Sequence, residues 1–225
     1  MEKVRIFIWD LDETVWFHLK NQGEVLAKLL KVKEKEIFAK QYSQMWKDFM
    51  PYFQSRKVSY EAVGQYVEGK IPILKAYQFS GNDFMEKITE GKKELEEVNP
   101  EAIEVMSYLK EKGYCNISIT DWFASNQESA LEVLRARPYI DKVYGCDDGY
   151  MKNNHYKTLQ MAKELQLEKR KEEYIMIGDS LTSDIFFANS LGIKSIWYNR
   201  KKLPNTTSYI PTLEVNSLLE LKNIF

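Results

Sequence analysis

Two short acidic motifs carry the side chains of this sequence that point most directly to chemistry. The segment DLDET places Asp10 and Asp12 directly after an apolar run, and GDSLTSD places Asp179 and Asp184 after another. In a parallel sheet both strand ends would deliver these carboxylates to the same edge, where open α/β folds bind their ligands. Carboxylates gathered at one edge repel one another unless a cation lies among them. Because Mg²⁺ prefers oxygen ligands, the pattern predicts a magnesium site.

The elements that must position these residues alternate along most of the chain, which predicts βαβ units around a parallel sheet. Strands are expected at residues 4–9, 114–120, 142–144, 174–177 and 194–198. Helices are expected at residues 102–112, 126–137, 154–167, 183–191 and from about 217. The predicted fold class is therefore α/β, a doubly wound parallel sheet with strand order 3-2-1-4-5 in the numbering of that list.

A block of helical periodicity separates the first expected strand from the others. From Val15 to about Val98 the apolar residues recur at helical spacing, and no strand is evident. We expect this block to be an inserted helical cap that closes over the carboxyl edge of the sheet. The predicted domains are a catalytic core of residues 1–15 and 99–225 and a cap of residues 16–98. The stretch from Leu203 to Pro211 is expected to be a surface loop.

Four motifs follow one another in an order that is found in a known superfamily. They are DLDET from Asp10, the strand end ISIT at Thr120, Lys152 ahead of an expected helix, and GDSLTSD from Gly178. In these motifs the sequence resembles the haloacid dehalogenase (HAD) superfamily over nearly its whole length. The helical insertion is similar to the cap of the subfamily that includes phosphoglycolate phosphatases, β-phosphoglucomutases and pyrimidine nucleotidases. The resemblance implies a HAD-like Rossmannoid core.

The resemblance also implies a Mg²⁺-dependent hydrolase that cleaves a phosphate monoester, such as a nucleotide or a sugar phosphate, through an aspartyl-phosphate. Asp10 would be the nucleophile. Asp12 would protonate the leaving oxygen and then take a proton from water. Dehalogenases of the superfamily lack this second aspartate, because a halide needs no protonation. The presence of Asp12 therefore favours phosphoryl chemistry.

The phosphate-binding group that the resemblance implies comprises Thr120, Asp121 and Lys152. The threonine hydroxyl and the lysine ammonium would hold the phosphoryl oxygens and balance the charge that grows on them.

The metal would be bound by the side chains of Asp10 and Asp179 and by the backbone carbonyl of Asp12. Asp184 is expected to orient Lys152 or a metal-bound water without binding the ion itself.

Three positions depart from the pattern of the superfamily without removing a catalytic group. Glu13 stands where many relatives have glycine, Asn153 follows the lysine where proline is common, and the pair Trp122-Phe123 replaces small residues. The bulky pair would narrow the mouth of the site or supply a stacking surface.

Residues of the cap region supply further substrate candidates. With Trp122, the candidates for contacting the substrate are His18 and Arg56. The alternative interpretations are that His18 is an exposed linker residue and that Arg56 carries a solvated charge.

Composition excludes several classes of function. The formal net charge of -1, from 32 basic and 33 acidic residues, gives no reason to expect nucleic acid or an anionic membrane as a partner. Cys115 and Cys146 form no close-spaced pair, which suits a reducing compartment. The amino-terminal apolar run is too short for a signal peptide or a membrane span, so a cytoplasmic protein is expected. The expected partner is a small phosphorylated metabolite, and nothing indicates the oligomeric state.

Two alternatives remain open at this stage. A phosphotransferase or phosphomutase would use the same residues and differ only in keeping water away from the aspartyl-phosphate. A non-catalytic, receiver-like module that binds phosphate would also use acidic groups, threonine and lysine around Mg²⁺. The large insertion disfavours a receiver, since a receiver has no leaving group to enclose.

Overall fold

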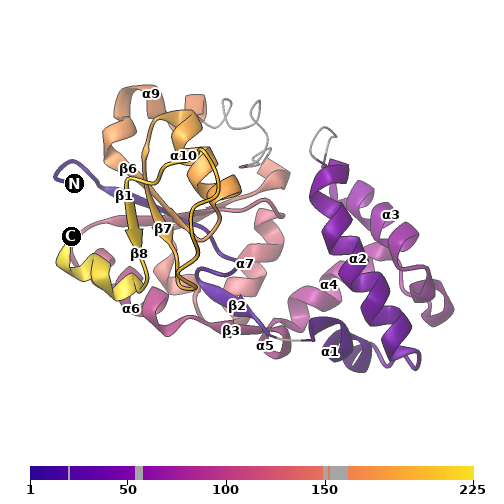
Figure 1. Cartoon of the computed structure of the whole chain (residues 1–225). Coiled ribbons are helices and arrows are strands. Elements are labelled where there is room, and N and C mark those ends of the chain that lie inside the picture. Colours follow the sequence, from indigo (N-terminus) through magenta and orange to yellow (C-terminus); the bar gives the residue numbers. More distant parts are fainter. Residues whose placement is uncertain (20, 54–57, 149–151, 153–161) are drawn as a thin grey trace.

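The computed structural model describes residues 1–19, 21–53, 58–148, 152 and 162–225. Its centre is a parallel sheet with the strand order β5-β4-β1-β6-β7-β8 (Figure 1). The strands are β1 (Ile6–Trp9), β4 (Cys115–Ile119), β5 (Lys142–Tyr144), β6 (Tyr174–Gly178), β7 (Lys194–Tyr198) and β8 (Leu213–Val215). The predicted fold class and the predicted order of the first five strands are confirmed. Strand β8, which the sequence analysis did not identify, forms an additional edge.

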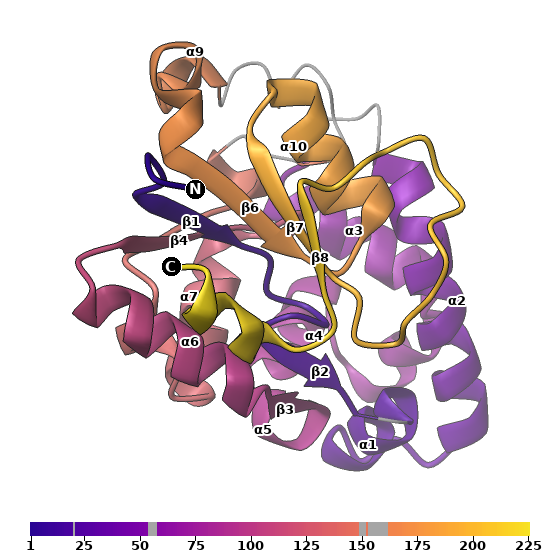
Figure 2. The same cartoon turned by 60° about the vertical axis from the view of Figure 1, so that its left-hand side comes forward.

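Strand β1 lies in the middle of the sheet because both of its faces are apolar. Phe7 and Trp9 pack into the cluster on one face, and Ile8 packs into the cluster on the other. Full burial of each such side chain is worth about 1.5–3 kcal/mol. Helices α6 (Pro100–Glu111) and α7 (Ala124–Val133) cover the first face, and α10 (Phe186–Leu191) covers the second (Figure 2).

Several helices of this core differ from the predicted bounds. The helix expected at 126–137 is α7, which ends earlier because Arg135 adopts the left-handed conformation, with φ 59°. The helix expected at 183–191 begins as a π-helical turn, Leu181–Ile185, and continues as α10. The helix expected from 217 is a 3₁₀ segment, Leu218–Asn223.

Short helical segments complete the core. Most of the helix expected at 154–167 lies outside the described residues. The other short segments are Arg137–Tyr139, Cys146–Asp148, α9 (Leu167–Arg170) and Lys171–Glu173.

A group of helices stands beside the sheet and has a hydrophobic core of its own (Figure 1). This helical insert comprises α1 (Gln22–Leu29), α2 (Lys35–Phe53), α3 (Tyr60–Lys70), the 3₁₀ segment Pro72–Tyr77, α4 (Gly81–Glu90) and α5 (Lys92–Leu95). Gly64 and Gly81 let α3 and α4 approach closely, since a Cβ on Gly81 would lie 1.9 Å from the Gly64 carbonyl oxygen. None of the described helices is both long and apolar enough to cross a membrane.

A two-stranded antiparallel ribbon joins the sheet to the helical insert. It pairs β2 (Trp16–His18) with β3 (Glu96–Val98), so the chain leaves and re-enters the core side by side. The expectation that residues 15–98 contain no strand was therefore wrong. Each strand has only three residues, which is too short for an alternating pattern to stand out against the helical periodicity around it.

Candidate active site

The ends of three neighbouring strands bring the first site residues to one edge of the sheet. Asp10 follows β1, Thr120 follows β4 and Asp179 follows β6. The register keeps these ends level, because Trp9 pairs with Ser118 on one side and with Ile177 on the other. The parallel topology that the sequence predicts is therefore what places these side chains together.

A buried ion-pair group forms around Lys152. Its ammonium contacts a carboxylate oxygen of Asp10 and lies 2.7 Å from Asp184 Oδ1. The backbone N–H of Lys152 donates to Asp121 Oδ1 at 2.6 Å, and Ser180 N donates to Asp184 Oδ2 at 3.0 Å. The neighbouring carboxylates raise the pKa of Lys152 against the opposing effect of its burial, so the lysine stays charged. Asp184, on the π-helical turn that follows β6, thus helps to hold the Lys152 ammonium beside Asp10.

Gly178, the last residue of β6, makes room for this arrangement. A Cβ at this position would lie 2.1 Å from Asp184 Oδ2, far inside van der Waals contact. The side chain of Asp184 is fully buried and crosses directly over the Gly178 backbone. Glycine at 178 is therefore what lets Asp184 reach Lys152.

Three carboxylates at this edge are crowded in a way that suits a divalent cation. Carboxylate oxygens of Asp10, Asp179 and Asp184 lie within 4.8 Å of one another. Burial and the charge of Asp184 raise the pKa of Asp179 to about 7, and the same two causes raise that of Asp10. A hard cation would offset both the burial and the repulsion, and Mg²⁺ takes ligands of this kind. The residues present therefore fit the magnesium that the sequence analysis expects.

Thr120 and Asp121 follow β4 and serve different contacts. The Thr120 hydroxyl oxygen accepts from Trp122 N at 3.1 Å and lines the cavity described below. The Asp121 carboxylate accepts from Lys152 N and, at 3.2 Å, from Ser183 Oγ. This carboxylate is committed to placing Lys152, and an anion there would repel phosphate. The phosphate contact expected of Asp121 stays a prediction, and the charge of its carboxylate disfavours that contact.

Asp12 lies on the turn after Asp10, with its carboxylate between two donors. Trp16 Nε1 donates to its Oδ1 at 2.7 Å, and Gln127 Nε2 lies 3.4 Å from its Oδ2. Gln127 is a buried polar residue on α7, and it also lies 3.4 Å from Thr120 Oγ1. The sequence analysis did not single out Gln127, although its place on the apolar face of a helix was a signal.

Glu13, one of the three departures from the expected pattern, adopts the left-handed conformation with φ 62°. This conformation costs a non-glycine residue about 1–2 kcal/mol. Its carboxylate accepts from His18 N at 3.0 Å and lies 3.4 Å from Arg200 Nη2, and the Arg200 guanidinium stacks over the Phe17 ring. These contacts offset the strain and anchor the turn that carries Asp10 and Asp12. Asn153, the other unusual position, lies outside the described residues.

A cavity of about 510 Å³ opens between the sheet edge and the helical insert. Its sheet side is lined by Asp10, Asp12, Thr120, Lys152, Asp179 and Asp184. Its insert side is lined by Tyr42, Trp46, Phe49, Ile88, Lys92 and Glu96. The cavity therefore has an acidic floor that contains one buried lysine, and a wall with several aromatic side chains.

Trp122 belongs to the aromatic wall of this cavity. Its ring centroid lies 5.3 Å from that of Trp46 and 5.3 Å from that of Phe49, and the next residue, Phe123, packs against Tyr60. The Trp122-Phe123 pair thus joins the catalytic edge to the helical insert.

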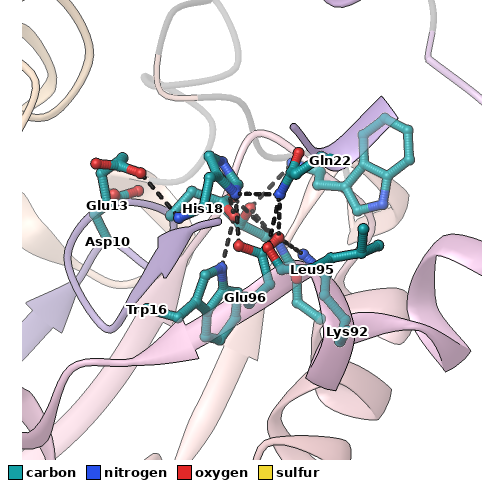
Figure 3. Close-up of polar contacts among 12 residues, drawn as sticks. Asp10, Glu13, Trp16, His18, Gln22, Lys92, Leu95 and Glu96 are labelled. Atoms are coloured by element: carbon teal, nitrogen blue, oxygen red, sulfur yellow. Dashed lines mark hydrogen bonds and ion pairs between the residues drawn. The ribbon is translucent and has the colours of Figure 1, made fainter. Parts of the chain in front are cut away.

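Of the two other substrate candidates, His18 lines the cavity and Arg56 lies outside the described residues. His18 is surrounded by Gln22, Lys92 and Glu96, a polar group that the sequence analysis missed (Figure 3). Charged residues in a helical block usually face solvent, and here the pairing of β2 with β3 brings His18 and Glu96 together.

The order of motifs and this geometry can be set beside known proteins. A family model for haloacid dehalogenase-like hydrolases matches residues 4–192. The chain belongs to this family. Its sheet, its acidic edge and its inserted helices are therefore features of a HAD-like hydrolase, as the resemblance in the four motifs implied.

Individual relatives of this HAD-like hydrolase include enzymes that act on small phosphates. The pyrimidine 5'-nucleotidase PynA of Streptococcus pneumoniae is 31% identical over 120 residues, which cover 53% of this chain and 51% of that protein. A glyceraldehyde 3-phosphate phosphatase of Pyrococcus furiosus is 32% identical over 103 residues, covering 46% and 42% respectively. The matched segments thus span about half the length of these curated relatives or less.

Several solved structures are similar over nearly the whole chain. The HAD-hydrolase YfnB of Bacillus subtilis, in a crystal form bound to magnesium, superimposes with a TM-score of 0.70 at 21% identity, covering 99% of this chain and 98% of that one. At this identity the likeness supports the fold.

Proposed function

We propose that the chain is a Mg²⁺-dependent phosphatase that hydrolyses a small phosphate monoester through an aspartyl-phosphate on Asp10. One observation carries the proposal: Asp10 stands at the floor of the cavity, in contact with Lys152 and grouped with Asp179 and Asp184. This arrangement combines a nucleophile, a charge for the phosphoryl oxygens and oxygen ligands for a metal. The phosphatases among the relatives and the magnesium bound to YfnB support it.

In the first step Asp10 attacks phosphorus in line with the leaving oxygen. The new P–O bond forms as the bond to the leaving group breaks, and Asp12 gives the leaving oxygen a proton. The Lys152 ammonium and the Thr120 hydroxyl hold the phosphoryl oxygens. When bound by Asp10, Asp179 and the backbone carbonyl of Asp12, Mg²⁺ shields the anionic nucleophile from its anionic target.

In the second step Asp12, now a carboxylate, takes a proton from water. That water attacks the phosphorus of the aspartyl-phosphate, which releases inorganic phosphate and restores Asp10. The group formed by Lys152 and Asp184 stays in place through both steps, because its buried contacts leave it little freedom.

In this proposal the helical insert acts as the cap, with residues 16–98 as cap and residues 1–15 and 99–225 as catalytic core. The cap excludes water and selects the leaving group. A cavity of about 510 Å³ is of the size that binds a small metabolite. Its aromatic wall and the polar group around His18 suit a leaving group with both an apolar and a hydroxyl-bearing part, as in a nucleotide or a sugar phosphate.

A substrate panel tests this function. We expect phosphate release from at least one nucleoside monophosphate, sugar phosphate, glyceraldehyde 3-phosphate or p-nitrophenyl phosphate in Mg²⁺, with a loss of about 100-fold or more in EDTA that excess Mg²⁺ restores. Equal rates in EDTA would remove the metal from the proposal. The phosphotransferase alternative is tested in the same assay, since label delivered to an acceptor sugar in place of water would favour it.

A further inference from the structure

A polar pair lies on the ribbon that joins the sheet to the helical insert, beside the proposed general acid. In the antiparallel ladder of β2 and β3, His18 stands directly opposite Glu96. The His18 Nδ1 atom is 2.7 Å from Glu96 Oε2, and Figure 3 shows the two side chains meeting. Because the ladder holds cross-strand partners at a fixed separation, the geometry of this pair is set by the backbone.

Glu96 is a buried carboxylate whose contacts fix its orientation. Its side chain is 2% exposed, and its Oε1 accepts from Lys92 Nζ at 3.0 Å and from Gln22 Nε2 at 3.2 Å. A buried carboxylate held in this way resists rotation, since losing a partner leaves its charge uncompensated. The ammonium of Lys92 also supplies the positive charge that the neighbouring acidic groups require, so the group does not depend on a metal ion.

The second ring nitrogen of His18 is directed at Asp12. His18 Nε2 lies 3.8 Å from Asp12 Oδ1, the same oxygen that accepts from Trp16 Nε1 at 2.7 Å. Trp16 and His18 are the first and last residues of β2, so the ribbon supplies both groups on this side of the carboxylate. The direction of the Asp12 carboxylate is therefore set by the strand that leads into the insert.

The same group reaches two helices of the insert. Gln22, the first residue of α1, lies 3.1 Å from His18 Nδ1 through its Nε2 atom. Its Oε1 accepts from the Tyr42 hydroxyl of α2 at 3.2 Å. The contacts thus run from the insert, through His18 and Glu96, to Asp12.

We propose that Glu96 is a positioning residue, which through His18 fixes the direction in which the Asp12 carboxyl group faces the leaving oxygen. The inference rests on the proposed function, because it concerns the proton that Asp12 gives to the leaving group. It requires no contact between Glu96 and the phosphate. Loss of the pair then slows the first step only for esters whose leaving oxygen needs a proton, whereas any effect on the second step is the same for every ester.

Two aryl phosphates of similar shape separate this role from a merely structural one. p-Nitrophenolate leaves without protonation, whereas phenolate, whose acid has a pKa of about 10 as in tyrosine, needs a proton. We expect Glu96→Gln to raise the ratio of kcat/KM for p-nitrophenyl phosphate to kcat/KM for phenyl phosphate by about tenfold or more, since general acid catalysis is worth about 10²–10⁴. The constant kcat/KM is compared because it covers only the steps up to departure of the leaving group, before the second step that both esters share. The matched control is Glu97→Gln, the same change at an exposed position of β3.

A second variant keeps the test independent of any folding defect in Glu96→Gln. In His18→Asn the amide nitrogen can still donate to Glu96, but the group that reaches Asp12 is gone, so the same rise in the ratio is expected. An unchanged ratio in both variants, or kcat/KM values that fall equally for both esters, would overturn the inference while leaving the proposed function intact. Failure of the unsubstituted protein to hydrolyse either ester or any member of the substrate panel would overturn the proposed function and the inference with it.

Discussion

Asp10→Asn is expected to lower turnover by at least about three orders of magnitude at saturating Mg²⁺, because an amide cannot serve as the attacking carboxylate. The substitution preserves the size of the side chain and removes one of the crowded buried charges, so the melting temperature in EDTA should not fall. Phosphate release under saturating substrate, together with a thermal melt, measures both quantities.

The matched control is Asp48→Asn, the same chemical change in an ion pair whose side chains are about one-third exposed. Asp48 lies on α2 and is 2.6 Å from Lys70 Nζ. Exposed pairs contribute about 0–1 kcal/mol, so activity and stability should both stay close to those of the unsubstituted protein. Turnover of Asp10→Asn within about tenfold of the unsubstituted protein would exclude Asp10 as the nucleophile.

Lys152→Met is expected to impair both stability and turnover, because it leaves Asp10 and Asp184 without the ammonium that lies between them. Removing one partner of a buried ion pair costs about 3–5 kcal/mol. The loss of stability should be larger in EDTA than in Mg²⁺, since a bound cation replaces part of the missing charge. It should also grow as the pH rises above the ordinary pKa of an aspartate, because burial and the charge of Asp184 raise the pKa of Asp10 in the folded state and loss of the Lys152 ammonium raises that pKa further.

Turnover of Lys152→Met in Mg²⁺ should fall by about 10²–10³, the usual loss for one group that stabilises a transition-state charge. Lys110→Met is the matched control. Lys110 makes an ion pair of 2.6 Å with Asp141, and both side chains are about one-third exposed. Two results would contradict the role given to Lys152. One is an equal loss of stability in the two lysine variants, and the other is a loss of stability in Lys152→Met that is no larger in EDTA than in Mg²⁺.

The sequence predicted the sheet and its acidic edge because the physical rules involved are local. An apolar run followed by acidic residues marks a buried strand end, and alternation with helices implies parallel pairing, so Asp10 and Asp179 had to meet. Their placement at one edge follows from the strand order alone. The role of Lys152 came from resemblance, because no pattern around a single lysine tells a buried ammonium from a solvated one.

The ribbon and the polar pair on it could not be predicted in the same way. Trp16–His18 and Glu96–Val98 are distant in sequence and short, so neither carries a periodic signal of its own. They pair because the inserted chain must leave and return at the same place. From the sequence, a charged residue such as Glu96 is expected to face solvent, because its tertiary partners Lys92 and His18 are not known. The edge strand β8 was not predicted because it also has only three residues.

The most direct test of the aspartyl-phosphate is to trap it. After rapid mixing of the protein with Mg²⁺ and ³²P-labelled p-nitrophenyl phosphate, an acid quench should leave label on the chain that hydroxylamine releases, as expected for an acyl phosphate. Digestion should place that label on the peptide containing Asp10, and Asp10→Asn should carry none. Phosphate release without any labelled chain at early times, or label that persists in Asp10→Asn, would contradict the account.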